Sequence, residues 1–279
     1  MHTFETSGPI SVMFSLVLAD IRITATDRTD AVVDIRPANN SARSEKMVEQ
    51  TSVDFVDGRL SIRTPKHLGL WLGRPGHITV DVHVPIGSRI DGDASLGELR
   101  TDGQLGDFRY KTGYGTIQVG VAGRVQIETG AGDVTVDDAG GDAEITTGTG
   151  RVRVGSIGGA AVLKNSNGDT WVGEVRGAVR ASAANGEISV DRADVGVMAR
   201  TARGAVRVGE AVSGSVQLET AAGRIDVGIP PGTAAWLDLD AGAGTVRNTL
   251  DSATGPDESD ATVEVRARTK YGDIVIHRS

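Results

Sequence analysis

The sequence predicts an all-β protein whose fold class is a parallel β-solenoid (β-helix), with two short strands in each coil of about 18 residues. Three observations lead to this prediction. A glycine that precedes an x-apolar-x-apolar pattern returns at nearly constant spacing, and strands of alternating apolar residues lie on both sides of it. Aromatic residues make up only 4% of a chain that contains 38 glycines. The recurring glycines are Gly97, Gly115, Gly132, Gly150, Gly168, Gly186, Gly204, Gly223, Gly244 and Gly272.

Residues 1–88 lie outside this repeat, yet their composition is typical of strands. Asp57-Gly58 between two apolar runs predicts a hairpin turn. An open sheet edge invites aggregation, so a solenoid needs a cap. We therefore expect residues 1–88 to form an N-terminal β cap continuous with the solenoid, and residues 89–279 to form the repeats. The strands expected in the cap are Ile10–Leu18, Ile21–Thr26, Ala31–Arg36, Val53–Phe55, Leu60–Ile62 and Ile78–Val84.

Within each coil the apolar residues form two alternating pairs, such as Val125/Ile127 followed by Val134/Val136. Period-2 alternation is typical of strands with one buried face. Each coil then contributes one strand to each of two facing parallel sheets, while the handedness of the solenoid stays open. A third apolar position after the second strand is expected to fill the end of the core, and it is occupied by Ala122, Ala139, Ile157, Val175, Ala193 and Ala211.

The turns between strands place a polar residue three positions before the recurring glycine. Only glycine enters positive φ freely, which suits a sharp reversal of the chain. The polar side chains are expected to hydrogen-bond the turn backbone, a structural role favoured over ligand binding. This column consists of Thr112, Thr129, Thr147, Asn165, Thr201 and Thr220.

The repeat becomes less regular after Pro230-Pro231-Gly232, and the last predicted coil contains Thr269–Ile276. Between them, the polar insert 251–260 is expected to bulge from the coil that ends with 262–267.

Composition and charge exclude several classes of function. The net charge is −8 with both signs mixed along the chain, which lacks the basic stripe that binds nucleic acid. There are no cysteines, which excludes thiolate chemistry and disulfides. The apolar stretch Ile10–Ala19 lacks a basic segment before it and is too short to span a bilayer. We expect a cytoplasmic protein without direct membrane insertion, and envelope association stays open.

No catalytic, cofactor-binding or metal site is predicted. Enzymes that act on polysaccharides need clustered carboxylates, and the outward strand positions offer no two adjacent acids. His77 and His83 have the even separation of one strand face, a weak metal signal for which a surface or cap role is the favoured alternative.

Four residues are predicted as possible contacts with a partner: Leu70, Trp71, Leu72 and Trp171. The first three belong to an apolar, glycine-punctuated segment, 68–73, that is either core of the cap or an exposed loop. Trp171 lies on the outer face of a predicted strand, where Arg153 of the preceding coil is expected to make a cation–π contact with it.

The repeat T-x-x-G-x-[VI]-x-[VI] occurs as Thr112–Val119 and again as Thr129–Val136. It resembles a bacterial β-strand-repeat family labelled "putative adhesin", domain of unknown function 4097. The ending Tyr271–Ile276 and the segment Val84–Ser88, which leads into the repeats, are also similar to that family. The resemblance covers nearly the whole chain and implies the solenoid fold. Its label implies adhesion at a cell surface.

We therefore expect a non-enzymatic protein-binding or scaffold module, a monomer or weak oligomer with a protein partner and no nucleic acid. One alternative is a cell-surface or envelope-associated adhesin. A second alternative is a carbohydrate-active β-helix enzyme.

Overall fold

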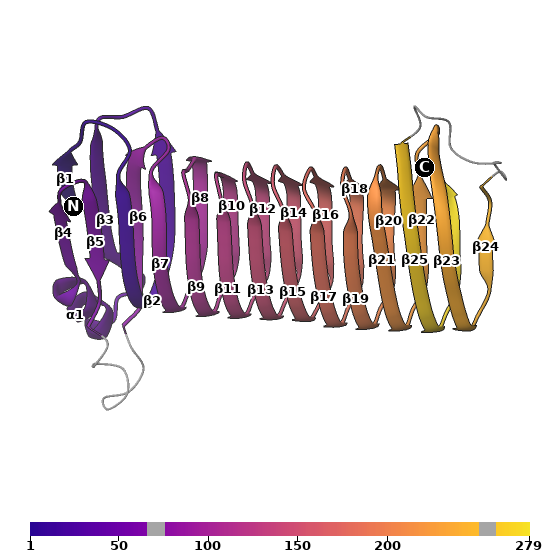
Figure 1. The fold of residues 1–279 in the computed structure, drawn as a ribbon. Coiled ribbons are helices and arrows are strands. Elements are labelled where there is room, and N and C mark those ends of the chain that lie inside the picture. The colour runs from indigo at the N-terminus through magenta and orange to yellow at the C-terminus, as the bar shows by residue number, and fades with distance from the viewer. Residues whose placement is uncertain (66–75, 251–260) are drawn as a thin grey trace. The chain divides into compact units, whose positions relative to one another are not determined.

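The computed structural model describes residues 1–65, 76–250 and 261–279 (Figure 1). These residues fall into two compact units, Met1–Asp138 and Ala139–Ser279, each of which is described by itself. The predicted division at residue 88 stays a prediction. The apolar segment with Leu70, Trp71 and Leu72 and the insert 251–260 lie outside the described residues.

The first unit contains a single long strand where the sequence predicted two. β2 (Ser11–Thr26) has 16 residues and passes from one sheet into the other. Its first half pairs in parallel with β7 (Arg89–Leu96), and its second half pairs in parallel with β8 (Leu99–Gln104). β2 therefore stacks on β7 and β8 as the preceding coil, although the intervening segment separates them in sequence.

The strands on either side of β2 in the sequence form antiparallel pairs. The hairpin of β4 (Ser52–Val56) and β5 (Arg59–Arg63) is confirmed, with Asp57 at φ 49° and Gly58 at φ 72° in its turn. Positive φ at both central residues is the conformation that the Asp-Gly pair favours. β1 (His2–Glu5) pairs antiparallel with β3 (Asp30–Pro37), which pairs antiparallel with β6 (Ile78–Pro85). Phe4 and Phe55 stack with ring centroids 5.1 Å apart, so an aromatic pair links β1 to β4.

The first unit also contains a helix that the sequence did not predict, α1 (Ala42–Gln50). The Ser41 side chain accepts a hydrogen bond from the Ser44 backbone N–H and so caps its first turn. Only Ser44 and Met47 are buried, which leaves too little apolar periodicity to detect. Within residues 1–65, 76–250 and 261–279, no helix is long and apolar enough to cross a membrane.

Regular coils follow β7 and β8 in the sequence. β9 (Phe108–Tyr114) and β11 (Val125–Ala131) pair in parallel, in register, with Phe108 beside Val125 and Thr112 beside Thr129. The buried aromatic residues Phe14, Phe108 and Tyr110 fill the core where β2 and β7 meet these coils. A Cβ on Gly92 would lie 2.1 Å from the Phe14 ring, so only glycine leaves room for this ring. The strands are β9 (Phe108–Tyr114), β10 (Ile117–Ala122), β11 (Val125–Ala131) and β12 (Val134–Ala139), whose last residue begins the second unit.

Tyr110→Phe should raise the stability of the first unit by about 1 kcal/mol. Tyr110 is 1% exposed, and its hydroxyl makes no hydrogen bond among the described residues. Burial raises the pKa of Tyr110 to about 12, and the nearby Thr112 hydroxyl lowers this pKa only in part. The Thr112 hydroxyl does not count as a hydrogen-bond partner of Tyr110 Oη. Removing an unpaired buried hydroxyl removes its desolvation cost. Urea unfolding of both proteins measures the change, and a loss of stability would show that the hydroxyl has a partner.

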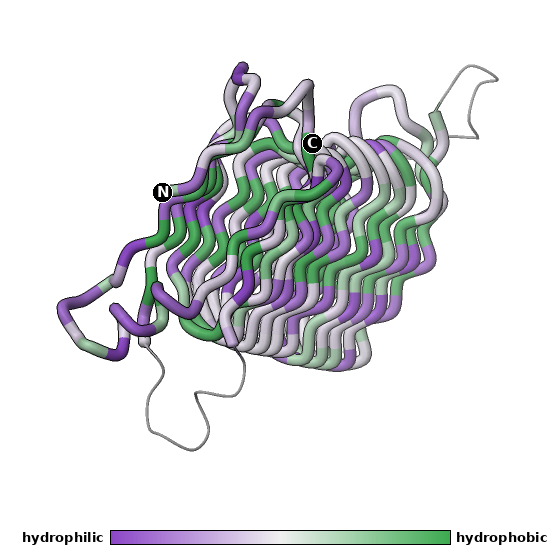
Figure 2. The backbone as a smooth tube through the Cα atoms, turned by 90° about the vertical axis from the view of Figure 1, so that its left-hand side faces the viewer, coloured by the Kyte–Doolittle hydropathy of each residue, from purple (hydrophilic) through white to green (hydrophobic). Residues whose placement is uncertain are grey.

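The second unit repeats the predicted coil. Its strands alternate between two parallel sheets, and each lies beside its copy one coil later, as Thr170 lies beside Ile188. Hydrophobic and hydrophilic residues alternate along the strands (Figure 2). The third apolar position is buried at Ile157, Val175, Ala193 and Ala211. The regular strands are β13 (Ala143–Thr149), β14 (Val152–Ile157), β15 (Ala161–Asn167), β16 (Thr170–Val175), β17 (Val179–Asn185), β18 (Ile188–Ala193), β19 (Val197–Arg203), β20 (Val206–Ala211), β21 (Gly214–Ala222) and β22 (Ile225–Ile229).

The end of the second unit departs from sequential stacking. β25 (Ala261–Tyr271) lies between β21 and β23 (Thr233–Ala243). β26 (Ile274–Arg278) lies between β22 and β24 (Val246–Asn248). The last coil in the sequence is therefore inserted one layer inside the coil that precedes it.

Several members of the polar column have the structural role predicted for them, but Thr147 does not, because its buried hydroxyl has no hydrogen-bond partner among the described residues. Thr201, Thr220 and Thr269 each donate a hydrogen bond to the turn-glycine carbonyl of the neighbouring coil, over 3.0–3.1 Å. Ala183 stands in the column between Asn165 and Thr201 and has no donor. Asn165 compensates because its Nδ2 donates to both Gly150 O and Gly168 O, each at 2.9 Å.

Asn165→Thr should therefore destabilise the second unit by about 1–2 kcal/mol, because a hydroxyl has one donor and Gly168 O would lose its partner. Adding Ala183→Thr should restore most of this loss, since the new hydroxyl can donate to Gly168 O as Thr201 does to Gly186 O. A double-mutant cycle in urea unfolding measures the coupling. Additive single effects would contradict the compensation.

Candidate functional site

The candidate site is the outer face of the sheet around Trp171 on β16. Its ring is half-buried and lies over Gly173, where a Cβ would come within 3.3 Å of Trp171 Cη2. Gly173 is itself buried. The missing side chain at position 173 therefore lets the indole lie against the sheet.

Two neighbouring strands hold the ring in place. Arg153 of β14 lies beside Trp171 in register, and its Cζ is 4.1 Å from the ring centroid. On the other side, Trp171 Nε1 donates a hydrogen bond to Asp191 Oδ1 of β18 over 3.1 Å. A half-buried ring with both contacts has little rotamer freedom left to lose on binding. We call Arg153, Trp171 and Asp191 with the floor Gly173 the Trp171 face.

The sequence predicted part of this arrangement. The Arg153–Trp171 cation–π contact is confirmed, while the Asp191 bond was missed. Asp191 stands one coil and two residues beyond Trp171, a diagonal neighbour on the same face. The role of Trp171 as a partner contact stays a prediction.

The predicted histidine pair does not form a metal site in the described part of the chain. His77 Nε2 lies 2.9 Å from Asp20 Oδ2, and His83 of β6 lies beside Thr24 of β2. Among the described residues there is no group of three or more His, Cys, Asp or Glu side chains placed to hold a metal ion.

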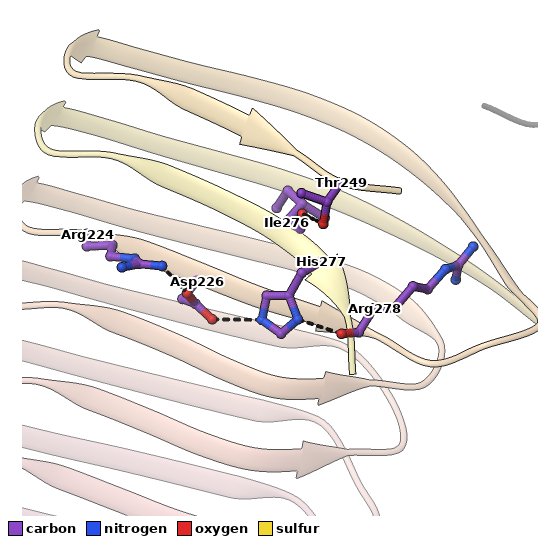
Figure 3. Close-up of polar contacts among 6 residues, drawn as sticks. All are labelled: Arg224, Asp226, Thr249, Ile276, His277 and Arg278. Carbon is purple, nitrogen blue, oxygen red and sulfur yellow. Dashed lines mark hydrogen bonds and ion pairs between the residues drawn. The ribbon is translucent and has the colours of Figure 1, made fainter. Parts of the chain in front are cut away.

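A second polar cluster fixes the last strand (Figure 3). Asp226 of β22 accepts from Arg224 over 2.8 Å and lies 3.0 Å from His277 Nε2 of β26. His277 Nδ1 lies 2.7 Å from Arg278 O. The pKa of His277 is raised, first by its hydrogen bond to the Arg278 carbonyl and then by Asp226. The imidazolium can donate to both oxygens, whereas a neutral ring can donate to only one.

This cluster predicts a pH-dependent contribution to stability. Because folding raises the pKa of His277, its stabilisation is fully present below the ordinary histidine pKa and is lost as pH rises through the folded value. The stability difference between the wild type and His277→Gln should thus be larger at pH 6 than at pH 8, by less than about 1 kcal/mol because both side chains are partly exposed to solvent. Urea unfolding at both pH values measures it, with His2→Gln of the first unit as control. An equal difference at both pH values would contradict the assignment.

Comparison with known protein families identifies one family that matches most of the chain. The family model described as Toastrack DUF4097 matches residues 10–277. No curated protein matches the sequence.

Several solved structures are similar to the chain. One is a "putative cell adhesion protein" from Clostridium sporogenes, at 13% identity and TM-score 0.25, covering 100% of this chain and 97% of that one. A second is a "putative adhesin" from Parabacteroides merdae, at 10% identity and TM-score 0.36, covering 99% and 94%. A third is a "putative lipid binding protein" from Parabacteroides distasonis, at 10% identity and TM-score 0.37, covering 98% and 95%.

Proposed function

The chain belongs to the Toastrack DUF4097 family, and from its outer sheet face we propose that it is a non-enzymatic protein-binding or scaffold module. The observation that carries the proposal is the Trp171 face. Tryptophan and arginine are the residue types that most often dominate the energy of protein interfaces. Here contacts within the protein already hold both side chains in place on one sheet face.

The chemistry of the face supports binding over catalysis. The Asp191 carboxylate accepts a hydrogen bond from the indole N–H, and the Arg153 guanidinium lies over the indole ring. What the face offers is an aromatic surface with guanidinium donors, which suits recognition of a protein surface.

Site-specific photocrosslinking tests the proposal. A benzophenone amino acid at Ser189, which lies beside Trp171 in register, should give one defined adduct in native cells. The same replacement at the exposed Ser182, on β17 of the other sheet, is the matched control and should not. Adding Trp171→Ala or Arg153→Ala should abolish the Ser189 adduct, provided that a thermal melt shows each variant folded.

The alternatives predict other outcomes. Adducts at both serines, or an adduct at Ser189 that survives Trp171→Ala, would contradict binding through this face. Fractionation before crosslinking separates the two locations: an adduct found only in the envelope fraction would favour the adhesin. Release of sugars from a polysaccharide by the purified protein would favour the enzyme.

A further inference from the structure

The outer edges of β23 and β24 carry no paired strand among the described residues. β23 pairs only with β25, and β24 pairs only with β26. A strand at the edge of a sheet presents a row of unpaired N–H and C=O groups, which is a template for another strand. With 11 residues, β23 is a long template.

Apolar side chains are uncovered at the same edge. In the inserted layer, Val265, Ala267 and Ile274 are each 0% exposed. In the outer layer, Leu237 and Leu239 are only half-buried, and Val246 is 47% exposed. An added strand would thus gain backbone hydrogen bonds and also cover one layer of core.

The charges on β23 indicate which charges a partner strand should carry. Its outward side carries Asp238 and Asp240, which lie in register with Arg266 and Arg268 of β25. The Arg268 guanidinium lies 3.4 Å from Asp238. On the open side the same two carboxylates face no strand among the described residues. Opposite charges on neighbouring strands are stabilising, so the best strand for this edge alternates apolar residues with basic ones.

A second copy of the chain fits the edge poorly. Symmetric pairing of two β23 strands would bring only acidic charges to the junction. In the first unit, the edge strand β4 pairs only with β5 among the described residues, and it offers Asp54 on its exposed side. Like charges placed opposite one another are destabilising, so both arrangements are disfavoured.

We propose that the open edge of β23 binds an extended segment of a partner protein in which apolar residues alternate with arginine or lysine. The segment adds a strand to the sheet. Its apolar residues cover Leu237 and Leu239, and its basic residues lie beside Asp238 and Asp240. This surface lies apart from the Trp171 face and does not depend on it.

Binding of labelled peptides to the full chain tests this proposal by fluorescence anisotropy. A peptide of alternating valine and arginine, of the length of β23, should bind at least about tenfold more tightly than its valine–glutamate counterpart. A first control peptide has the same composition with all arginines in one block, so it keeps the charge and loses the alternation. A version N-methylated at alternate amides, prepared in both frames, keeps the charge and loses the strand hydrogen bonds. Both controls should bind at least about tenfold more weakly.

Variants of the protein complete the test. Asp238→Asn with Asp240→Asn should weaken binding of the valine–arginine peptide about tenfold, whereas Glu144→Gln on β13 should leave its affinity unchanged. Equal binding of the block or N-methylated peptides would overturn the proposal, because attraction to an acidic protein would then explain the affinity. Concentration-dependent dimerisation that the peptide cannot displace would also overturn it, because a second copy would then occupy the edge.

Discussion

Gly186→Ala is expected to destabilise the second unit by about 4 kcal/mol. Two costs combine at this turn. The backbone of Gly186 has φ 138°, which side chains rarely adopt, and a Cβ there would lie 2.1 Å from Gly168 O of the preceding coil. That oxygen belongs to the turn backbone and accepts the Asn165 hydrogen bond, so it cannot move aside without loss.

A second glycine separates the two costs. Gly232 has φ 78°, and a Cβ on it would meet nothing within 4 Å. Gly232→Ala should therefore show the backbone cost alone, about 1 kcal/mol. Urea unfolding monitored by circular dichroism measures both variants. Equal losses at the two positions would mean that contact between coils contributes little, and that φ alone selects the turn glycines.

The periodic part of the fold was predictable because each coil obeys the same local rules. The alternating pairs, the third apolar position and the Thr column all appear where the spacing placed them. Each of them depends on contacts between adjacent coils, and the repeat length brings such residues together. The stacking of β2 on β7 and β8 was not predicted, because residues 27–88 separate β2 from these strands in the sequence.

The order of the last coils could not be read from the sequence. Val216, Val265 and Leu237 occupy equivalent inward positions on β21, β25 and β23. Their strands share one apolar alternation, so sequential and inserted stacking satisfy the same pattern. The alternation of apolar and polar residues determines the register of a strand. Which strand lies beside it depends on the path of the whole segment that connects the two.

The candidate site was also predictable only in part, for contacts between direct neighbours in register. Adjacent coils bring Arg153 to Trp171, a direct neighbour in register. Asp191 reaches the indole only because the ring extends diagonally over Gly173. That direction depends on a rotamer, which spacing does not determine.

Ile274→Ala should destabilise the second unit by about 3 kcal/mol. Ile274 is 0% exposed and lies between Ile225 and Val246. Its removal leaves a cavity with strands on both sides. In sequential stacking β26 would be the terminal layer and the same change would cost little, so the experiment discriminates between the two orders.

A matched pair of valines makes the comparison independent of side-chain size. Val265→Ala changes a residue that is 0% exposed in the inserted layer, and Val246→Ala changes one that is 47% exposed in the outer layer. We expect a loss of about 2 kcal/mol for the first and below about 1 kcal/mol for the second, since a cavity forms only where both sides are covered. Sequential stacking would raise the cost at Val246, because its strand would then lie between two others. A larger loss at Val246 than at Val265 would therefore contradict the insertion and, with it, the open edge of β23.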